Sequence, residues 1–165
     1  MRWCRGFCWP ATCWRRAGTH LPDSSIQEKQ EAIVARFNAI DDWEHRYREI
    51  IALGKQLPAL PEELRTESNK VKGCQSQVWF APRIEERRLF FQADSDAAIV
   101  RGLVGLLLEV YNGQQPAEIL AANETFLDRI GLIEHLSQTR SNGLSAMIKQ
   151  IKYYALAYNS ILERA

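Results

Sequence analysis

The order of patterns along the chain predicts an α+β fold. Helical patterns occupy the beginning and the end of the 165 residues, and a stretch rich in strand-forming residues lies between them. The segment 97–110 is apolar on nearly every side, which is typical of a central helix. Because helices and strands are grouped and do not alternate, we expect a small antiparallel sheet of about three strands packed against several helices.

The composition is that of one globular domain, with 46% hydrophobic and 25% charged residues. We expect this domain to cover residues 26–162. The 21 basic and 20 acidic side chains leave a net charge of +1, which argues against a nucleic-acid partner. Arg101 and Glu109 interrupt the most apolar stretch, which is also shorter than the ~20 residues that a bilayer requires, so no membrane span is expected.

Residues 1–25 differ from the rest, since arginine and tryptophan are frequent and helical or strand periodicity is absent. We expect a disordered extension or a translation start placed too far upstream. A metal or redox cluster of Cys4, Cys8 and Cys13 is an alternative, with His20 as the one candidate fourth ligand. An organelle-targeting segment is another, because the arginines lack nearby acids.

Two helices are predicted before the strands. Ser25 and Glu28 form a capping-box pattern that opens the first helix. Asp41 is expected to cap the second helix and Gly54 to end it. The connection contains two prolines, and residues 61–64 are expected to form one short helical turn.

The strand-rich stretch predicts three antiparallel strands, at about 69–72, 76–82 and 88–94. Pro82 and the charged run 85–88 interrupt it, as the loop of a hairpin does.

Helical patterns return after residue 94. Asp94, Ser95 and Asp96 are all candidate N-caps of the central helix, which Asn112 and Gly113 should end. Three more helices are expected, at 116–122, from Asn123 to about 136, and at about 142–162.

Cys74 is the candidate nucleophile, because it stands apart from the other three cysteines in a loop between two predicted strands. Gly73 permits a tight turn that presents the thiol. Lys70 and Lys72 lie close in sequence and favour the reactive thiolate. The side chains that follow, Gln75, Ser76 and Gln77, offer neutral hydrogen-bond donors to a sulfur anion.

The residues alone leave a second interpretation of Cys74 open. Free cysteine is among the most buried residue types, and no histidine stands near Cys74 in sequence to act as a base. The thiol could therefore serve as a small core side chain. The uneven placement of the cysteines argues against a disulfide framework and favours a reducing compartment, so a cytoplasmic location is expected.

From residue 26 to residue 162 the chain resembles the SufE family of sulfur acceptors, which includes the CsdE proteins. The loop Gly73–Trp79, GCQSQVW, is similar to the family's signature loop. Its sequence resembles the SufE branch of the family more than the CsdE branch. Five further segments carry the resemblance: Trp43-Glu44 with Ile50–Gly54, Leu57-Pro58, Asp94–Val100, Gly102-Leu103, and Arg140–Leu144 with Ala146-Met147.

The resemblance implies a SufE/NifU-like fold and a function. Cys74 would accept sulfur as a persulfide from a cysteine desulfurase of the SufS or CsdA kind and stimulate that enzyme. The sulfur would then pass to an iron–sulfur assembly scaffold resembling SufBCD. Pyridoxal phosphate would belong to the desulfurase, so this chain needs no cofactor and no metal, and no stand-alone enzymatic activity is expected. Monomer and homodimer both stay open.

The resemblance also suggests supporting residues. Arg140 would stabilise a sulfur anion or dock the partner, or else cap a helix or lie at the surface. Asp94 and Asp96 would hydrogen-bond the Cys74 loop, or serve as N-caps. Because an exposed persulfide is lost to reductants or oxidised, Cys74 is expected to rest partly sheltered and to swing out on partner binding.

Two other functions remain as alternatives. One is a binding module that activates a desulfurase allosterically, with Cys74 purely structural. The other is a cluster scaffold, which the single cysteine of residues 26–165 disfavours because clusters normally take four ligands.

Overall fold

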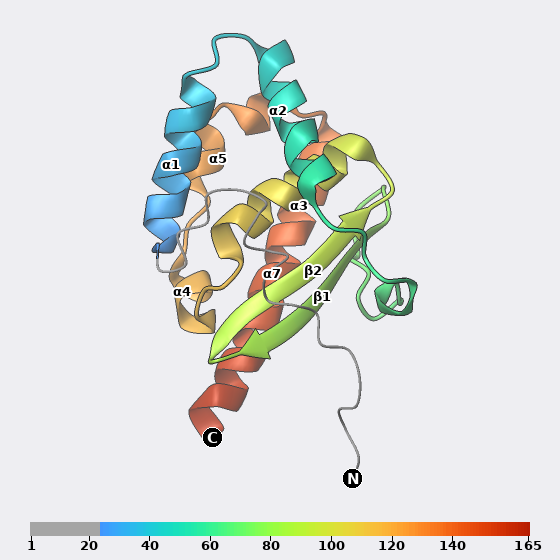
Figure 1. Ribbon diagram of the computed structural model, residues 1–165, viewed down its shortest axis with the longest axis vertical. Coiled ribbons are helices and arrows are strands. Elements are labelled where there is room, and N and C mark those ends of the chain that lie inside the picture. The colour runs from blue at the N-terminus through green and yellow to red at the C-terminus, as the bar shows by residue number, and fades with distance from the viewer. Residues whose placement is uncertain (1–23) are drawn as a thin grey trace.

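The computed structural model describes residues 24–165, and the expectations for residues 1–23 lie outside the described part. Helix α3 (Ala98–Tyr111) is the centre of the fold (Figure 1). It contacts α1 (Ile26–Asn38), α2 (Trp43–Gln56), the second strand of a hairpin and the long last helix, α7 (Gln138–Arg164). The α+β class predicted from the sequence is confirmed.

Helix α1 begins where the capping box places it. The Glu28 amide donates to Ser25 Oγ at 3.2 Å, and the Ser25 amide donates to Glu28 Oε2 at 2.8 Å. For α2 the expected cap, Asp41, is wrong by one residue. Asp42 directly precedes the first helical residue, so its Oδ1 reaches the His45 amide at 2.9 Å.

Gly54 does not end α2, contrary to the sequence prediction, because the helix continues to Gln56. It faces α3, where a Cβ on Gly54 would lie 2.7 Å from the Gly102 amide nitrogen. The glycine therefore serves a close approach of two helices. The following connection contains the expected short turn, a 3₁₀ helix η2 (Glu62–Leu64).

The sheet has two strands, β1 (Val78–Glu85) and β2 (Arg88–Ser95), so the predicted third strand at 69–72 is wrong. That segment makes a single bridge, between Lys70 and Trp79, before the chain turns at Gly73. Pro82 lies inside β1 and not in the hairpin loop. Beyond the bridge at Trp79, the described residues pair with β1 on its β2 side only, and such an edge tolerates proline.

The turn of the hairpin consists of Glu86 and Arg87, which have positive φ angles of 49° and 63°. A two-residue turn with both φ angles positive favours Asn-Gly. We expect the double substitution Glu86→Asn, Arg87→Gly to raise the free energy of unfolding by about 1 kcal/mol. Urea titration measures it. The Glu86→Ala, Arg87→Ala variant removes the same charges and keeps the backbone strain, and an equal gain there would contradict the prediction.

Helix α3 contributes more residues to the described core than any other helix or strand, and ten of its fourteen residues are buried. Its N-cap is Ala97, without a side-chain cap, so none of the three proposed N-caps is correct. Its C-cap is Asn112, as expected from the sequence. The Phe91 amide donates to Asn112 Oδ1 at 2.7 Å, which joins the end of α3 to β2.

A buried lysine joins α1 to the C-terminal end of α3. Lys29 Nζ donates to the Asn112 carbonyl at 3.0 Å, and burial, with the nearby Arg88, lowers the pKa of Lys29 from 10.5 to about 8. Between these two values the unfolded chain binds more protons than the folded one, so raising the pH from 8 to 10.5 removes a penalty on folding.

We therefore expect the stability difference between Lys29→Met and the parent chain to change with pH. The free energy of unfolding of Lys29→Met minus that of the parent should fall steadily between pH 8 and pH 10.5. Urea titration across this range measures it, with exposed Lys55→Met as the control. A difference that is the same at every pH would contradict the assignment.

The C-terminal part contains α4 (Pro116–Ala121), α5 (Thr125–Arg129), α6 (Leu132–His135) and α7. The single helix predicted after Asn123 is two short ones, because Gly131 has a φ of +68° and breaks the pattern. Helix α7 begins four residues earlier than predicted, where Ser137 Oγ accepts from the Arg140 amide. It packs against α3, α4 and β1.

Candidate functional site

Cys74 lies in the loop that precedes β1 and faces the first turns of α7. Its Sγ is 3.3 Å from the Gly143 carbonyl oxygen, to which the thiol donates. A Cβ on Gly143 would lie 3.5 Å from this sulfur, so the bare helix surface leaves room for the thiol. Sequence reasoning gave Gly143 no contact with Cys74, because the two residues are 69 positions apart.

The turn of the loop is made by Gly73, whose φ is +91°. Residues with a side chain rarely adopt this angle, so the glycine is required by the backbone. The turn places Cys74 at intermediate burial against the main core. The expected partial shelter of the thiol is confirmed, and its outward swing stays a prediction.

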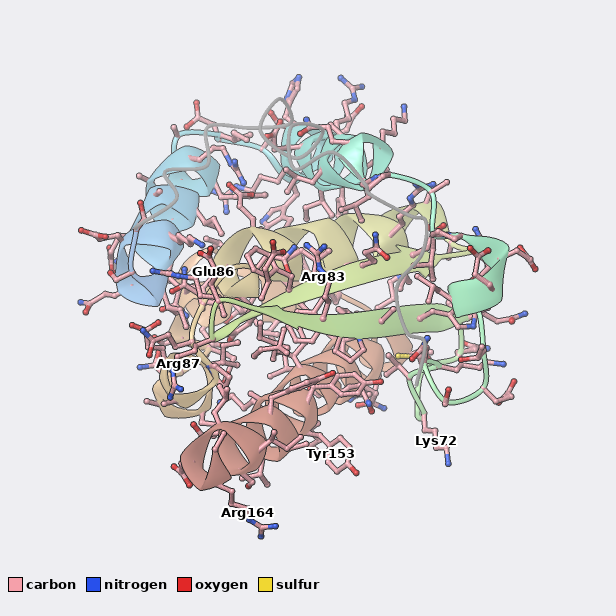
Figure 2. All side chains as sticks on the ribbon, turned by 60° about the horizontal axis from the view of Figure 1, so that its bottom comes forward. Lys72, Arg83, Glu86, Arg87, Tyr153 and Arg164 are labelled. Carbon is pink, nitrogen blue, oxygen red and sulfur yellow. The ribbon has the colours of Figure 1, made fainter. Side chains whose placement is uncertain are left out.

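Burial raises the pKa of the Cys74 thiol, so this conformation favours the protonated form. The lysines expected to favour the thiolate do not act in this way here. Lys70 Nζ lies 3.6 Å from Glu67 Oε1, and Lys72 is exposed and projects away from the fold (Figure 2). A reactive thiolate therefore calls for a change at the loop, either movement or the approach of a partner.

The neutral side chains after Cys74 do not surround the sulfur in this conformation. Gln75 and Gln77 are exposed and Ser76 is partly buried. Within residues 24–165, the hydrogen bond of the Cys74 thiol goes to Gly143.

Asp96 holds the end of this loop. Its Oδ1 accepts from the Gln77 amide at 3.0 Å, and its own amide donates to the Gln77 carbonyl at 3.2 Å. Of the two roles predicted for Asp96, the geometry therefore favours hydrogen bonding to the Cys74 loop over capping the helix.

Asp94 supports a neighbouring region. Its buried carboxylate accepts from Arg65 Nη2 at 2.9 Å and from the Leu60 amide at 3.4 Å, and Arg101 Nε lies 3.2 Å away. These contacts fix the 57–65 connection against β2 and α3. Among the described residues Asp94 makes no hydrogen bond to residues 73–77 of the loop.

We expect Asp96→Ala to free the loop and expose the thiol. Losing a charge-assisted hydrogen bond should raise the rate of Cys74 alkylation by iodoacetamide about tenfold, because opening of the loop becomes easier. Peptide mass spectrometry over time measures the rate. Asp41→Ala, at an exposed position, is the matched control. An unchanged alkylation rate in Asp96→Ala would show that this bond does not hold the loop.

Arg140 lies in the first turn of α7, about one turn before Gly143. Its side chain is exposed, and it has no hydrogen-bond or ion-pair partner in the described part of the chain. The structure thus places Arg140 on the helix that contacts Cys74, without contact with the sulfur. Its role in binding a sulfur anion or a partner stays a prediction.

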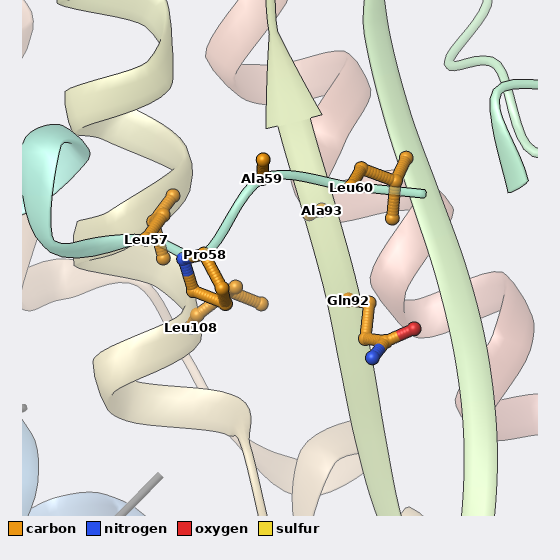
Figure 3. A pocket seen from close by; sticks show the side chains of 7 residues that line it. All are labelled: Leu57, Pro58, Ala59, Leu60, Gln92, Ala93 and Leu108. Carbon is orange, nitrogen blue, oxygen red and sulfur yellow. The ribbon is translucent and has the colours of Figure 1, made fainter. Parts of the chain in front are cut away.

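Two hollows lie near these elements. One is small and carries no nucleophile (Figure 3). Its lining residues are apolar except for one glutamine: Leu57, Pro58, Ala59, Leu60, Gln92, Ala93 and Leu108. The other is open, lies beside the Cys74 loop, and is lined by Lys72, Gly73, Asn142, Ser145, Ala146, Lys149, Gln150 and Tyr153. In residues 24–165 no group of three or more His, Cys, Asp or Glu side chains is placed to hold a metal.

Residues 31–155 match the family model described as "SufE: Fe-S metabolism associated domain". The chain belongs to the SufE family. The resemblance seen in the sequence is thereby confirmed. An uncharacterized SufE-like protein of Rhizobium meliloti is 46% identical to this chain, over 74% of this chain and 91% of the relative. A second one, from Rhizobium etli, is 49% identical, over 74% of this chain and 86% of the relative.

A third relative has a name that states a function. The sulfur acceptor protein CsdE of Escherichia coli is 40% identical over 73% of this chain and 84% of its own length. A solution structure of a hypothetical protein from Thermus thermophilus shares the fold, with a TM-score of 0.68 and 21% identity, over 80% of this chain and 96% of that one. Among the described residues, no helix has the length and apolar character that crossing a bilayer demands.

Proposed function

We propose that this SufE-family chain accepts sulfur on Cys74 from a cysteine desulfurase. The observation that carries the proposal is a free thiol on a glycine turn, half-buried against α7 beside an open hollow. It is the one free cysteine among residues 24–165. The 40% identity to a sulfur acceptor protein of Escherichia coli supports the same role.

The transfer is a thiol–persulfide exchange. The Cys74 thiolate attacks the outer sulfur of the donor's R–S–SH group, a new S–S bond forms on Cys74, and the S–S bond of the donor breaks. The electron pair leaves with the donor as R–S⁻, so no external oxidant or reductant is consumed. Cys74 ends as Cys74–S–SH.

The resting geometry explains why such a thiol needs its partner. A protonated, half-buried sulfur hydrogen-bonded to Gly143 is a poor nucleophile toward small molecules. Moving the loop outward relieves the burial that raises the pKa of Cys74. The same shelter would protect the persulfide from reductants and oxidants once the loop returns.

The resemblance to the SufE family supports a proposal for the remaining steps. The desulfurase carries pyridoxal phosphate and makes the donor persulfide, and its turnover increases when Cys74 removes the sulfur. Cys74 then delivers the sulfur to an iron–sulfur assembly scaffold of the SufBCD kind. A reducing, cytoplasmic compartment suits a chain that works through a free thiol.

Mass spectrometry tests the acceptor step. The chain is mixed with a desulfurase and free cysteine without reductant, then digested with trypsin. Cleavage after Lys72 and Arg83 gives a peptide, residues 73–83, in which Cys74 is the one cysteine. We expect this peptide to gain about 32 Da, the mass of one sulfur. A gain on peptides with Cys4, Cys8 or Cys13 in its place would overturn the assignment.

A further inference from the structure

Helix α7 displays an unusual outward face next to the Cys74 loop. The exposed large hydrophobic side chains of the described residues all lie on this helix: Tyr153, Leu156 and Ile161 are 65%, 55% and 61% exposed. Tyr153 and Leu156 continue a helical row through Asn142, Ser145 and Lys149, with the spacing of neighbours on one face. We call this row, with Lys72 and Gly73, the α7 stripe.

The α7 stripe is continuous with the sulfur-accepting loop. Lys72 and Gly73 of the loop and Lys149 and Tyr153 of α7 line the same open hollow. In Figure 2 the Lys72 and Tyr153 side chains project on the same side of the molecule. Because Gly73 lines the hollow and adjoins Cys74, a protein that brings a persulfide to Cys74 comes close to the hollow.

The charged residues of the α7 stripe are all basic. The lining of the hollow contains two lysines and no carboxylate. Neither Lys72 nor Lys149 has an ion-pair partner in residues 24–165. Unpaired lysines beside an exposed tyrosine and leucine form a surface that suits acidic and apolar side chains together.

Two occupants from this chain itself fit poorly. An isologous dimer through this hollow would bring Lys72 and Lys149 of both copies into one interface, to which the lining of the hollow adds no carboxylate. Residues 1–22 contain four arginines and no acid, so the N-terminal segment would be repelled by the same lysines.

We propose that the α7 stripe is the docking surface for the sulfur-donor protein, which presents acidic side chains to Lys72 and Lys149 and an apolar side chain to Tyr153 and Leu156. This inference rests on the proposed function and adds a surface outside the Cys74 loop. Docking on α7 would hold the donor against the helix whose Gly143 retains the thiol, so binding and release of the loop occur at one place.

Binding of the desulfurase from the same organism, with its pyridoxal phosphate, tests the proposal. Isothermal titration calorimetry compares the parent chain with Lys72→Glu, Lys149→Glu and with Tyr153→Ser, Leu156→Ser. Each double variant should raise the Kd about tenfold or more, and the charge variant should lose most of the salt dependence. Iodoacetamide labelling of Cys74 and the thermal midpoint should stay as in the parent.

The matched control is Arg87→Glu, Arg164→Glu, which makes the same change of charge at exposed positions on the hairpin tip and at the end of α7 (Figure 2). It should leave the Kd within about twofold of the parent value. Equal weakening by the control, no binding by the parent chain, or a dimer in sedimentation that Tyr153→Ser, Leu156→Ser dissolves would overturn the proposal.

The proposal and the sulfur-acceptor function fail in different ways. Weakened binding by the α7 stripe variants, without a mass gain on residues 73–83 of the parent, would support the docking surface and refute sulfur acceptance. A mass gain on the parent, with normal affinity in both stripe variants, would refute the docking surface and leave sulfur acceptance in place.

Discussion

Cys74→Ser is expected to abolish the stimulation of desulfurase turnover completely. The hydroxyl occupies the same place beside Gly143 but cannot form a persulfide, so sulfur stays on the desulfurase and blocks the next cycle. Turnover, measured as alanine released from cysteine, should fall to the rate of the desulfurase alone. The folded structure should persist, because the change is nearly isosteric.

The control for this experiment is the triple variant Cys4→Ser, Cys8→Ser, Cys13→Ser, which keeps Cys74 and should stimulate as the parent does. The alternative of an allosteric binding module makes the opposite prediction. If Cys74→Ser still stimulates turnover and still binds the desulfurase, the chain acts through binding and the cysteine is structural.

Gly102→Ala is expected to destabilise the fold strongly. A Cβ at this position would lie 2.2 Å from the Ile50 carbonyl oxygen and 2.7 Å from Ile50 Cγ2, across the contact of α2 and α3. Because the nearest atom belongs to the backbone of a packed helix, a side-chain rotation cannot remove the clash. The helices must separate, at a cost of about 3 kcal/mol or more in the free energy of unfolding.

Thermal and urea unfolding followed by circular dichroism measure this loss, and the midpoint should fall by ~10 °C. Gly143→Ala is the matched control, since it is also a buried helical glycine but its Cβ would meet only Cys74 Sγ, at 3.5 Å. The control should be neutral or stabilising, because alanine favours helix. A similar midpoint for both variants would contradict the account of the α2–α3 contact.

The close approach of α2 and α3 at Gly102 is not evident from the sequence alone. The local sequence predicts that Gly54 ends a helix, because helices commonly end at a glycine. Its partner, Gly102, lies 48 positions later in a different helix. Only the packing of the two helices shows that both glycines serve one close approach.

The sequence by itself determined the features that depend on neighbouring residues. The Ser25–Glu28 capping box, the apolar helix that ends at Asn112 and the turn of Gly73 before Cys74 all follow from local hydrogen bonding, apolar periodicity or backbone freedom. Family resemblance, carried by the motif around Cys74, was equally local, and the match over residues 31–155 confirmed it.

The tertiary structure decided what depends on residues far apart in the chain. It reduced the expected third strand to one bridge, because the turn at Gly73 carries the chain away from β1. It buried the Asp94 carboxylate between two arginines. It also placed Cys74 against Gly143, where burial raises the pKa of the thiol despite nearby lysines in the sequence. Desolvation and packing depend on which residues the fold brings into contact, and the spacing of residues along the chain does not predict those contacts.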